Sequence, residues 1–199
     1  MPHETIYSAD LTAGSLKLRE SRVVAGLLIN QVSEKEFRDV IVTQNILQAR
    51  TAATAIRLAR LLRKRLEGFD SRLWLMVWEG DKVLATQALL ASAMKHSRLL
   101  FDFMDLVIRE EYRLLHIELP TASWSTFLDG CTSRCPGVEK WSESTRRRLK
   151  STVFHILSQA GYLRSTKKPE LQKVTILPEL VSILNAMGET RLLGCLQLP

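Results

Sequence analysis

Residues 51–66 constrain the fold most, because apolar and basic side chains recur there with the period of an α-helix. A helix turns by about 100° per residue, so side chains three or four positions apart share a face. One face of this segment is apolar and collects Ala52, Ala55, Ile56, Leu58, Ala59, Leu62 and Leu66. The opposite face carries Arg57, Arg60 and Lys64. Such a helix buries one side and leaves the basic side in water, so the sequence predicts a packed helical domain.

Two further helices are predicted before this basic helix. The first covers residues 14–30, where apolar side chains again recur at helical spacing. The second covers residues 34–42, because Ser33 can cap its start and Glu36 completes a capping box. Three helices in succession, the last with a basic outer face, are typical of helix-turn-helix modules. We therefore expect residues 1–68 to form such a module.

The middle of the chain, residues 69–119, is predicted to be helical with mixed or acidic faces. Helical periodicity runs through residues 71–78, 81–95 and 97–115. Several large apolar side chains of this region have the spacing of core residues: Trp74, Trp78, Phe101, Phe103 and Met104. Its carboxylates could be interpreted as pairs for acid–base catalysis, but carboxylates on helices usually face solvent. We expect the solvent-facing arrangement for Asp102, Asp105, Glu110 and Glu111.

The last part of the chain, residues 120–199, is predicted to be a separate module. A short helix is expected over residues 123–129, and a long helix capped by Ser142 is expected over residues 142–160. A final helix opens at a proline and covers residues 178–187.

Between the last two helices, the character of the sequence changes. Residues 162–164 and 173–177 have the composition of two short strands, and the polar connection between them contains Lys167 and Lys168. A long helix followed by a β-hairpin with a basic tip is typical of a winged helix. The expected fold is thus mainly α, with a helix-turn-helix-like N-terminal module, a helical middle and a C-terminal winged-helix module with a short β-hairpin.

Two stretches hold nearly all of the excess positive charge. Residues 50–66 contain six bases and no acid, and residues 142–173 contain eight bases and two acids, so each stretch has a net charge of +6. Since the whole chain has a net charge of +7, the remainder must carry −5. Charge segregated in this way makes two positive surfaces on an acidic body, and polyanions bind to such surfaces.

Composition also limits where the protein is expected. With 199 residues and 46% apolar side chains, the chain can fill a hydrophobic core. No apolar run approaches the roughly 20 residues that cross a bilayer, so we expect no membrane span and no membrane partner. Residues 1–10 contain acids and lack the apolar stretch of a secretion signal. We therefore expect a cytoplasmic location, in which Cys131, Cys135 and Cys195 stay reduced.

The sequence contains no recognisable catalytic or metal-binding motif. Cys131 and Cys135 could supply two zinc ligands, but no second pair of ligands follows at the usual spacing. The four histidines are scattered, at His3, His96, His116 and His155. Glycine-rich phosphate loops and nucleophile motifs are also missing from the sequence. We expect neither enzymatic activity nor a metal or other cofactor.

The two basic stretches predict contacts to double-stranded DNA, because Arg and Lys on one helical face can neutralise several phosphates together. From the first stretch we expect contacts by Arg50, Arg57, Arg60 and Lys64. From the long helix and the hairpin we expect contacts by Arg147, Arg148, Ser151, His155, Lys167 and Lys168. Arg146 is phased closer to the buried side of that helix. Phosphate contacts carry no sequence information, so binding should be largely sequence-tolerant.

Other interpretations of the basic faces stay open. A single run of bases is usually a solvated surface. The faces could also dock acidic surfaces of other proteins, in which case the chain is an adaptor. RNA is less favoured, because the basic segments lack interleaved aromatic side chains for stacking unpaired bases. The sequence leaves the oligomeric state open.

The order of these segments resembles the BrxA family of bacteriophage exclusion (BREX) systems. The resemblance lies in residues 33–66, SEKEFRDVIVTQNILQARTAATAIRLARLLRKRL, in the opening ADLTAG of residues 9–14, and in residues 142–177. It implies a small, non-enzymatic helical protein that binds DNA through helix-turn-helix-like modules. It also implies a setting beside a methyltransferase, an ATPase and other antiphage components, so other BREX proteins are possible partners. No single contact residue is transferred from the family.

Overall fold

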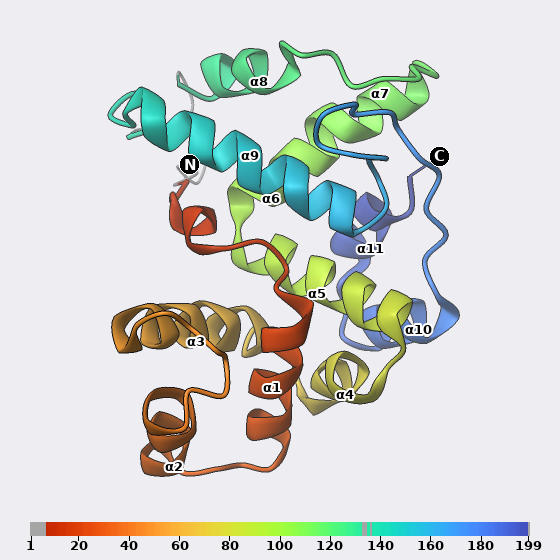
Figure 1. Cartoon of the computed structure of the whole chain (residues 1–199). Helices are drawn as coiled ribbons and strands as arrows, with labels where there is room; N and C mark the ends of the chain where they lie inside the picture. Colours follow the sequence, from red (N-terminus) through yellow and green to blue (C-terminus); the bar gives the residue numbers. More distant parts are fainter. Residues whose placement is uncertain (1–6, 133–134, 136, 199) are drawn as a thin grey trace, which may run out of the picture.

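The computed structural model describes residues 7–132, 135 and 137–198 of a mainly helical protein (Figure 1). The expectation of no secretion signal falls largely on residues 1–6, outside the described residues, as does His3. The N-terminal third contains a short 3₁₀ helix, three α-helices and a π-helical turn: η1 (Asp10–Ala13), α1 (Leu18–Ile29), α2 (Glu34–Arg38), η2 (Asp39–Thr43) and α3 (Ala52–Leu66). In the described residues, no helix combines the length and the apolar character that a membrane span requires.

The middle region and the C-terminal third are also helical. The middle contains α4 (Ser71–Glu79), α5 (Lys82–His96), α6 (Arg98–Phe103), the π-helical turn η3 (Met104–Ile108) and α7 (Arg109–Arg113). The last third contains α8 (Ser123–Thr132), α9 (Glu143–Gln159), α10 (Pro178–Ala186) and α11 (Thr190–Leu196). Sequence analysis missed α11 and ended α8 too early. Helix α1 packs against α3 and α4, and Figure 1 shows it between them.

Three of the predicted helix starts are confirmed by their caps. The Ser33 hydroxyl accepts the backbone N–H of Glu36, whose carboxylate accepts the backbone N–H of Ser33 at 2.9 Å, so the predicted capping box is present. Thr51 caps α3 and Ser142 caps α9 in the same way, each by accepting an N–H three residues ahead. These local bonds explain why helix starts could be predicted from sequence alone.

The first predicted helix begins later than expected, because residues 14–17 serve another purpose. Arg65 lies in the buried interior of the protein, and its guanidinium donates to the carbonyl oxygens of Ser15 at 2.7 Å and Gly14 at 2.9 Å. The backbone N–H of Leu16 donates to Oε1 of Gln159 on α9 at 3.2 Å. These contacts hold the segment extended, and α1 starts only after Lys17. One short segment therefore ties α3 to α9.

The core under α9 is built from aromatic rings. The Phe103 ring lies 5.2 Å from Trp124 and 5.3 Å from Phe127, both in edge-on geometry, and 6.2 Å from Phe154. These contacts join the end of α6 to α8 and α9. Phe101, Phe103 and Met104 are buried as predicted, whereas Trp78 is 38% exposed. One hydrophobic cluster runs through all three regions, and their boundaries at 68 and 119 remain a prediction.

The solvent-facing arrangement expected of the acidic residues is wrong for Asp102. Its carboxylate is buried, accepts the Tyr7 hydroxyl at 2.8 Å, and forms an ion pair with Arg98 at 2.8 Å. A buried carboxylate needs such partners to remain in a low-dielectric interior. Asp102 therefore anchors the N-terminal segment to α6.

The predicted hairpin is wrong: residues 162–164 contain a single bridge residue, Leu163, and the second strand does not form. Residues 173–177 form no strand, because the side chain of Gln87 on α5 takes the place of a partner: it donates to the Thr175 carbonyl at 2.8 Å and accepts the Leu177 N–H at 2.9 Å. Pairing occurs earlier in the chain instead. Antiparallel bridges join Leu163 to Leu171 and Glu118 to Glu170. The loop after α9 is thus held by two isolated bridges and not by a regular hairpin.

Replacing Arg65 with Ala should destabilise the fold strongly. The substitution leaves two largely buried carbonyls without donors and opens a gap between α3 and residues 14–15, so the free energy of unfolding should fall by about 2–4 kcal/mol. The matched control is Lys64→Ala on the exposed face of the same helix, which should change it by less than about 0.5 kcal/mol. Urea denaturation followed by circular dichroism measures both. Equal effects of the two substitutions would contradict the structural role of Arg65.

Candidate nucleic-acid interface

The outer face of α3 carries a group of exposed bases. Arg57, Arg60 and Lys64 lie along it, and Arg50 is exposed just before the helix begins. Across residues 7–132, 135 and 137–198, no ion pair or hydrogen bond engages these four side chains. Their charges are therefore available to an external anion. All four were predicted as DNA contacts, and the structure brings them to one end of the molecule.

The other two bases of α3 are used within the protein. Arg63 forms ion pairs with Glu34 and, at 2.7 Å, with Glu67, and its guanidinium lies 5.1 Å from the Phe37 ring centre. Burial lowers the pKa of Arg65 to about 10, so it stays protonated at neutral pH. The net charge of residues 50–66 is therefore larger than the charge that this surface presents to a ligand. Helical phase placed both residues off the face of Arg57, Arg60 and Lys64.

Helix α9 presents the second group. Arg147, Arg148, Ser151 and His155 are all exposed on it, as predicted. The carboxylate nearest to Arg147 is that of Glu143 at 3.9 Å, and both side chains are about three-quarters exposed. Arg146 turns toward the protein, where it donates to the Val138 carbonyl at 3.3 Å. The predicted difference between Arg146 and its two neighbours is confirmed.

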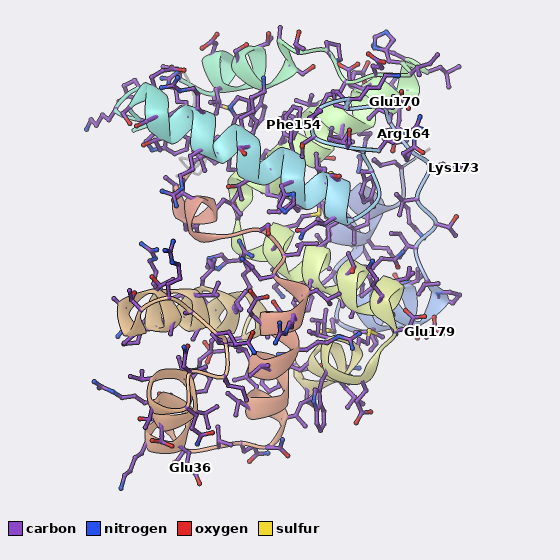
Figure 2. The ribbon with its side chains drawn as sticks, viewed as in Figure 1. Glu36, Phe154, Arg164, Glu170, Lys173 and Glu179 are labelled. Carbon is purple, nitrogen blue, oxygen red and sulfur yellow. The ribbon has the colours of Figure 1, made fainter. Side chains whose placement is uncertain are left out.

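A small hollow lies beside this face, and three of the residues that line it were not predicted as contacts. Arg147, Lys150, Ser151, Phe154 and Thr166 line a cavity of about 280 Å³ between α9 and the loop that follows it. The ammonium of Lys150 lies 5.5 Å from the centre of the Phe154 ring, and Figure 2 labels Phe154. Two cations and two hydroxyls around an open hollow suit a phosphate group. Lys150 lies in the basic stretch of residues 142–173, whereas no pattern in the sequence pointed to Thr166 as a binding residue.

The basic loop after α9 is partly neutralised by one acid. Glu170 pairs with Lys168 and with Arg164, each at 2.8 Å. Figure 2 shows Arg164 and Glu170 close together above the end of α9, with Lys173 further along the chain. Hydrogen bonds from Lys168 and Arg164 lower the pKa of Glu170, so its negative charge persists at neutral pH. Lys167 is exposed and has no such partner in the part of the chain described.

The two basic helices are joined by the same short segment. Both α3 and α9 pack against η1, and Figure 1 shows η1 and the residues after it between them. The bonds from Arg65 and Gln159 fix this segment on both sides. For the described residues, no cluster of His, Cys, Asp or Glu has the arrangement of metal ligands. The arrangement is thus a pair of exposed cationic faces on one rigid support.

Comparison with known proteins places the chain in a family. The family model described as BrxA matches residues 5–188. The chain is similar to the BREX protein BrxA of Paramagnetospirillum magneticum (strain ATCC 700264 / AMB-1), with 41% identity over 98% of each chain. It is also similar to the BREX protein BrxA of Escherichia coli O9:H4 (strain HS), with 32% identity over 98% of this chain and 92% of the relative. A crystal structure of an uncharacterised protein from Magnetospirillum magneticum superposes with a TM-score of 0.88, at 39% identity over 97% of this chain and 99% of that one. On these similarities, the chain belongs to the BrxA family.

Proposed function

We propose that this protein is a component of a BREX antiphage system that binds double-stranded DNA without catalysing a reaction. The names of its relatives support the defence setting. The observation that carries DNA binding is the set of exposed bases on α3 and α9, most of which have no carboxylate partner in the described residues. Unpaired cations on a folded surface gain most from phosphates, because no internal ion pair has to be broken first.

The geometry of α3 suits a duplex. Arg57, Arg60 and Lys64 are three and four residues apart on one face, so their attachment points span about 10 Å along the helix axis. Duplex DNA carries about one phosphate charge per 1.7 Å of its axis. A helix of this kind can lie in or across the major groove with its basic face toward the backbone.

In this proposal, each basic helix belongs to its own DNA-binding module. Helix α3 follows α1 and α2 as the third helix of a helix-turn-helix-like unit, although the connection from η2 to α3, residues 44–51, is longer than the usual turn. Helix α9 and the bridged loop after it form the second unit, with Lys167 at the tip of a short wing. Support for the wing comes from the bridge between Leu163 and Leu171.

Binding is proposed to be largely insensitive to sequence and selective for duplexes. The exposed side chains of α3 are Ala52, Ala53, Arg57, Arg60 and Lys64, which include no Asn or Gln for reading adenine. The exposed faces of α3 and α9 also contain no Phe, Tyr or Trp ring on which an unpaired base could stack. Phe154 lies on α9 but is only 5% exposed. Duplex DNA is therefore favoured over RNA and single strands.

Charge reversal on α3 should weaken duplex binding in a salt-dependent way. Arg57→Glu combined with Arg60→Glu removes two phosphate contacts, so affinity should fall by about tenfold or more and the slope of log affinity against log salt should flatten by about 2. Mobility shifts or fluorescence anisotropy between about 50 and 200 mM salt measure both quantities. The pair Arg147→Glu and Arg148→Glu tests α9 in the same way.

The control has the same change in net charge on helices other than α3 and α9. Arg113 on α7 and Arg191 on α11 are exposed, and the double variant Arg113→Glu with Arg191→Glu should leave most of the affinity and the slope intact. DNA binding by α3 and α9 is rejected if all three double variants weaken binding equally, since that result reports net charge alone. Retention of wild-type affinity by both the α3 and the α9 variant rejects it as well.

Removing the acid that neutralises the loop should strengthen binding. Glu170→Gln releases Lys168 and Arg164 from their ion pairs, so duplex affinity should rise about two- to fivefold at low salt and return toward wild type as salt screens the charge. Glu179→Gln on α10 makes the same charge change away from this loop (Figure 2) and should have a smaller effect. Titration of a labelled duplex compares the two variants. An equal gain in both would show that the loop does not contact DNA.

A further inference from the structure

A groove beside the basic face of α3 is not explained by DNA binding. It has a volume of about 540 Å³ and runs between α2 with η2 on one side and α3 on the other. Its apolar lining consists of Phe37, Ile41, Val42, Ile56 and Ala59. Of these, Phe37, Val42 and Ile56 are only half-buried. A duplex backbone has no use for an apolar surface of this kind, so the groove suits a different ligand.

The rim of the groove is cationic. Lys35 and Arg38 line one edge, Arg60 lines the other, and Lys35 and Arg38 are exposed without a carboxylate partner in the described ranges. Glu34 also lines the groove, but its carboxylate is engaged by Arg63 at the wall. The charges on the rim that have no ion-pair partner within the described residues are therefore positive. An occupant that complements this rim carries acidic side chains next to its apolar ones.

The walls have the spacing that a third helix requires. Lys35, Arg38 and Val42 are three and four residues apart on one wall, and Ile56, Arg60 and Arg63 repeat the same spacing on the other. Two adjacent helices with apolar residues between them form the type of groove into which an amphipathic helix lays its apolar face. The wall formed by α2 and η2 is about three turns long. The π-helical turn η2 lies in this wall, and such turns are frequent at functional positions.

We propose that this groove binds an acidic amphipathic helix of a partner protein. Apolar side chains on one face of that helix enter the space between Val42 and Ile56, and its carboxylates pair with Lys35, Arg38 and Arg60. The groove is separate in its contacts from the face of Arg57 and Lys64, and only Arg60 lines the groove and lies on the DNA face. A partner helix bound here lies beside DNA and shares only Arg60 with it.

The test uses a designed peptide as the probe. A fluorescein-labelled peptide of about 16 residues has Leu at positions that share one helical face and mostly Glu elsewhere. A scrambled peptide of equal composition removes the apolar face, and a version with Lys in place of Glu reverses the charge. Anisotropy titration of the full-length protein should show saturable binding to the designed peptide, with at least about tenfold weaker binding of both control peptides.

Variants then locate the binding. Val42→Trp fills the groove without changing charge and should weaken peptide binding about tenfold, while Val83→Trp, at an exposed position on α5, should not. Arg38→Glu at the exposed rim should also weaken it, which covers the case in which Val42→Trp folds poorly by circular dichroism. Duplex affinity of Val42→Trp should equal that of wild type, so this result is independent of whether DNA binding is correct.

Three results would overturn the proposal. The first is equal binding of designed and scrambled peptides. The second is parallel loss of duplex and peptide binding in Val42→Trp, which assigns the groove to the DNA interface. The third is a dimer of the protein alone, detected by sedimentation, that Val42→Trp dissociates, because the occupant would then be a second copy of this chain.

Discussion

The structure depends on how residues 14–16 are held between two helices. The Arg65 guanidinium binds the carbonyls of Gly14 and Ser15, and the Gln159 side chain binds the N–H of Leu16. The first contact comes from α3 and the second from α9, so the two helices that carry the basic faces share one support. Arginine suits this role because its planar guanidinium holds several N–H donors in a fixed fork, whereas a lysine ammonium is a compact charge on a flexible stem. The buried Arg65 therefore helps to fix the helix on which the exposed arginines lie.

This arrangement gives the bases of one helix three different roles. Arg57 and Lys64 face water and are available to phosphates, Arg63 is neutralised by Glu34 and Glu67, and Arg65 is structural. Arg60 stands between the DNA face and the apolar groove. Two different anionic ligands, a DNA duplex and an acidic amphipathic helix, can thus be proposed for neighbouring sides of α3. Only the second needs the apolar surface beside Val42 and Ile56.

Local signals in the sequence were sufficient for most of the helices, although not for α11, and for much of the candidate interface. The caps at Ser33 and Ser142 act within four residues, and the phase of Arg146 against Arg147 follows from helix geometry alone. What failed depended on partners far away in the sequence. Residues 174–176 are β-branched, but Gln87 on α5 bonds the backbone of Thr175 and Leu177, so no second strand forms. Likewise, nothing near Asp102 in the sequence indicated its bond to Tyr7.

We propose that the exposed arginines of α3 and α9 contact the duplex backbone. Modification of arginine by phenylglyoxal, quantified by mass spectrometry with and without saturating duplex, tests this residue by residue. DNA should protect Arg57, Arg60, Arg147 and Arg148 and leave the exposed Arg113 and Arg191 as reactive as before. Unchanged reactivity at the first four, or equal protection at all six, would contradict it.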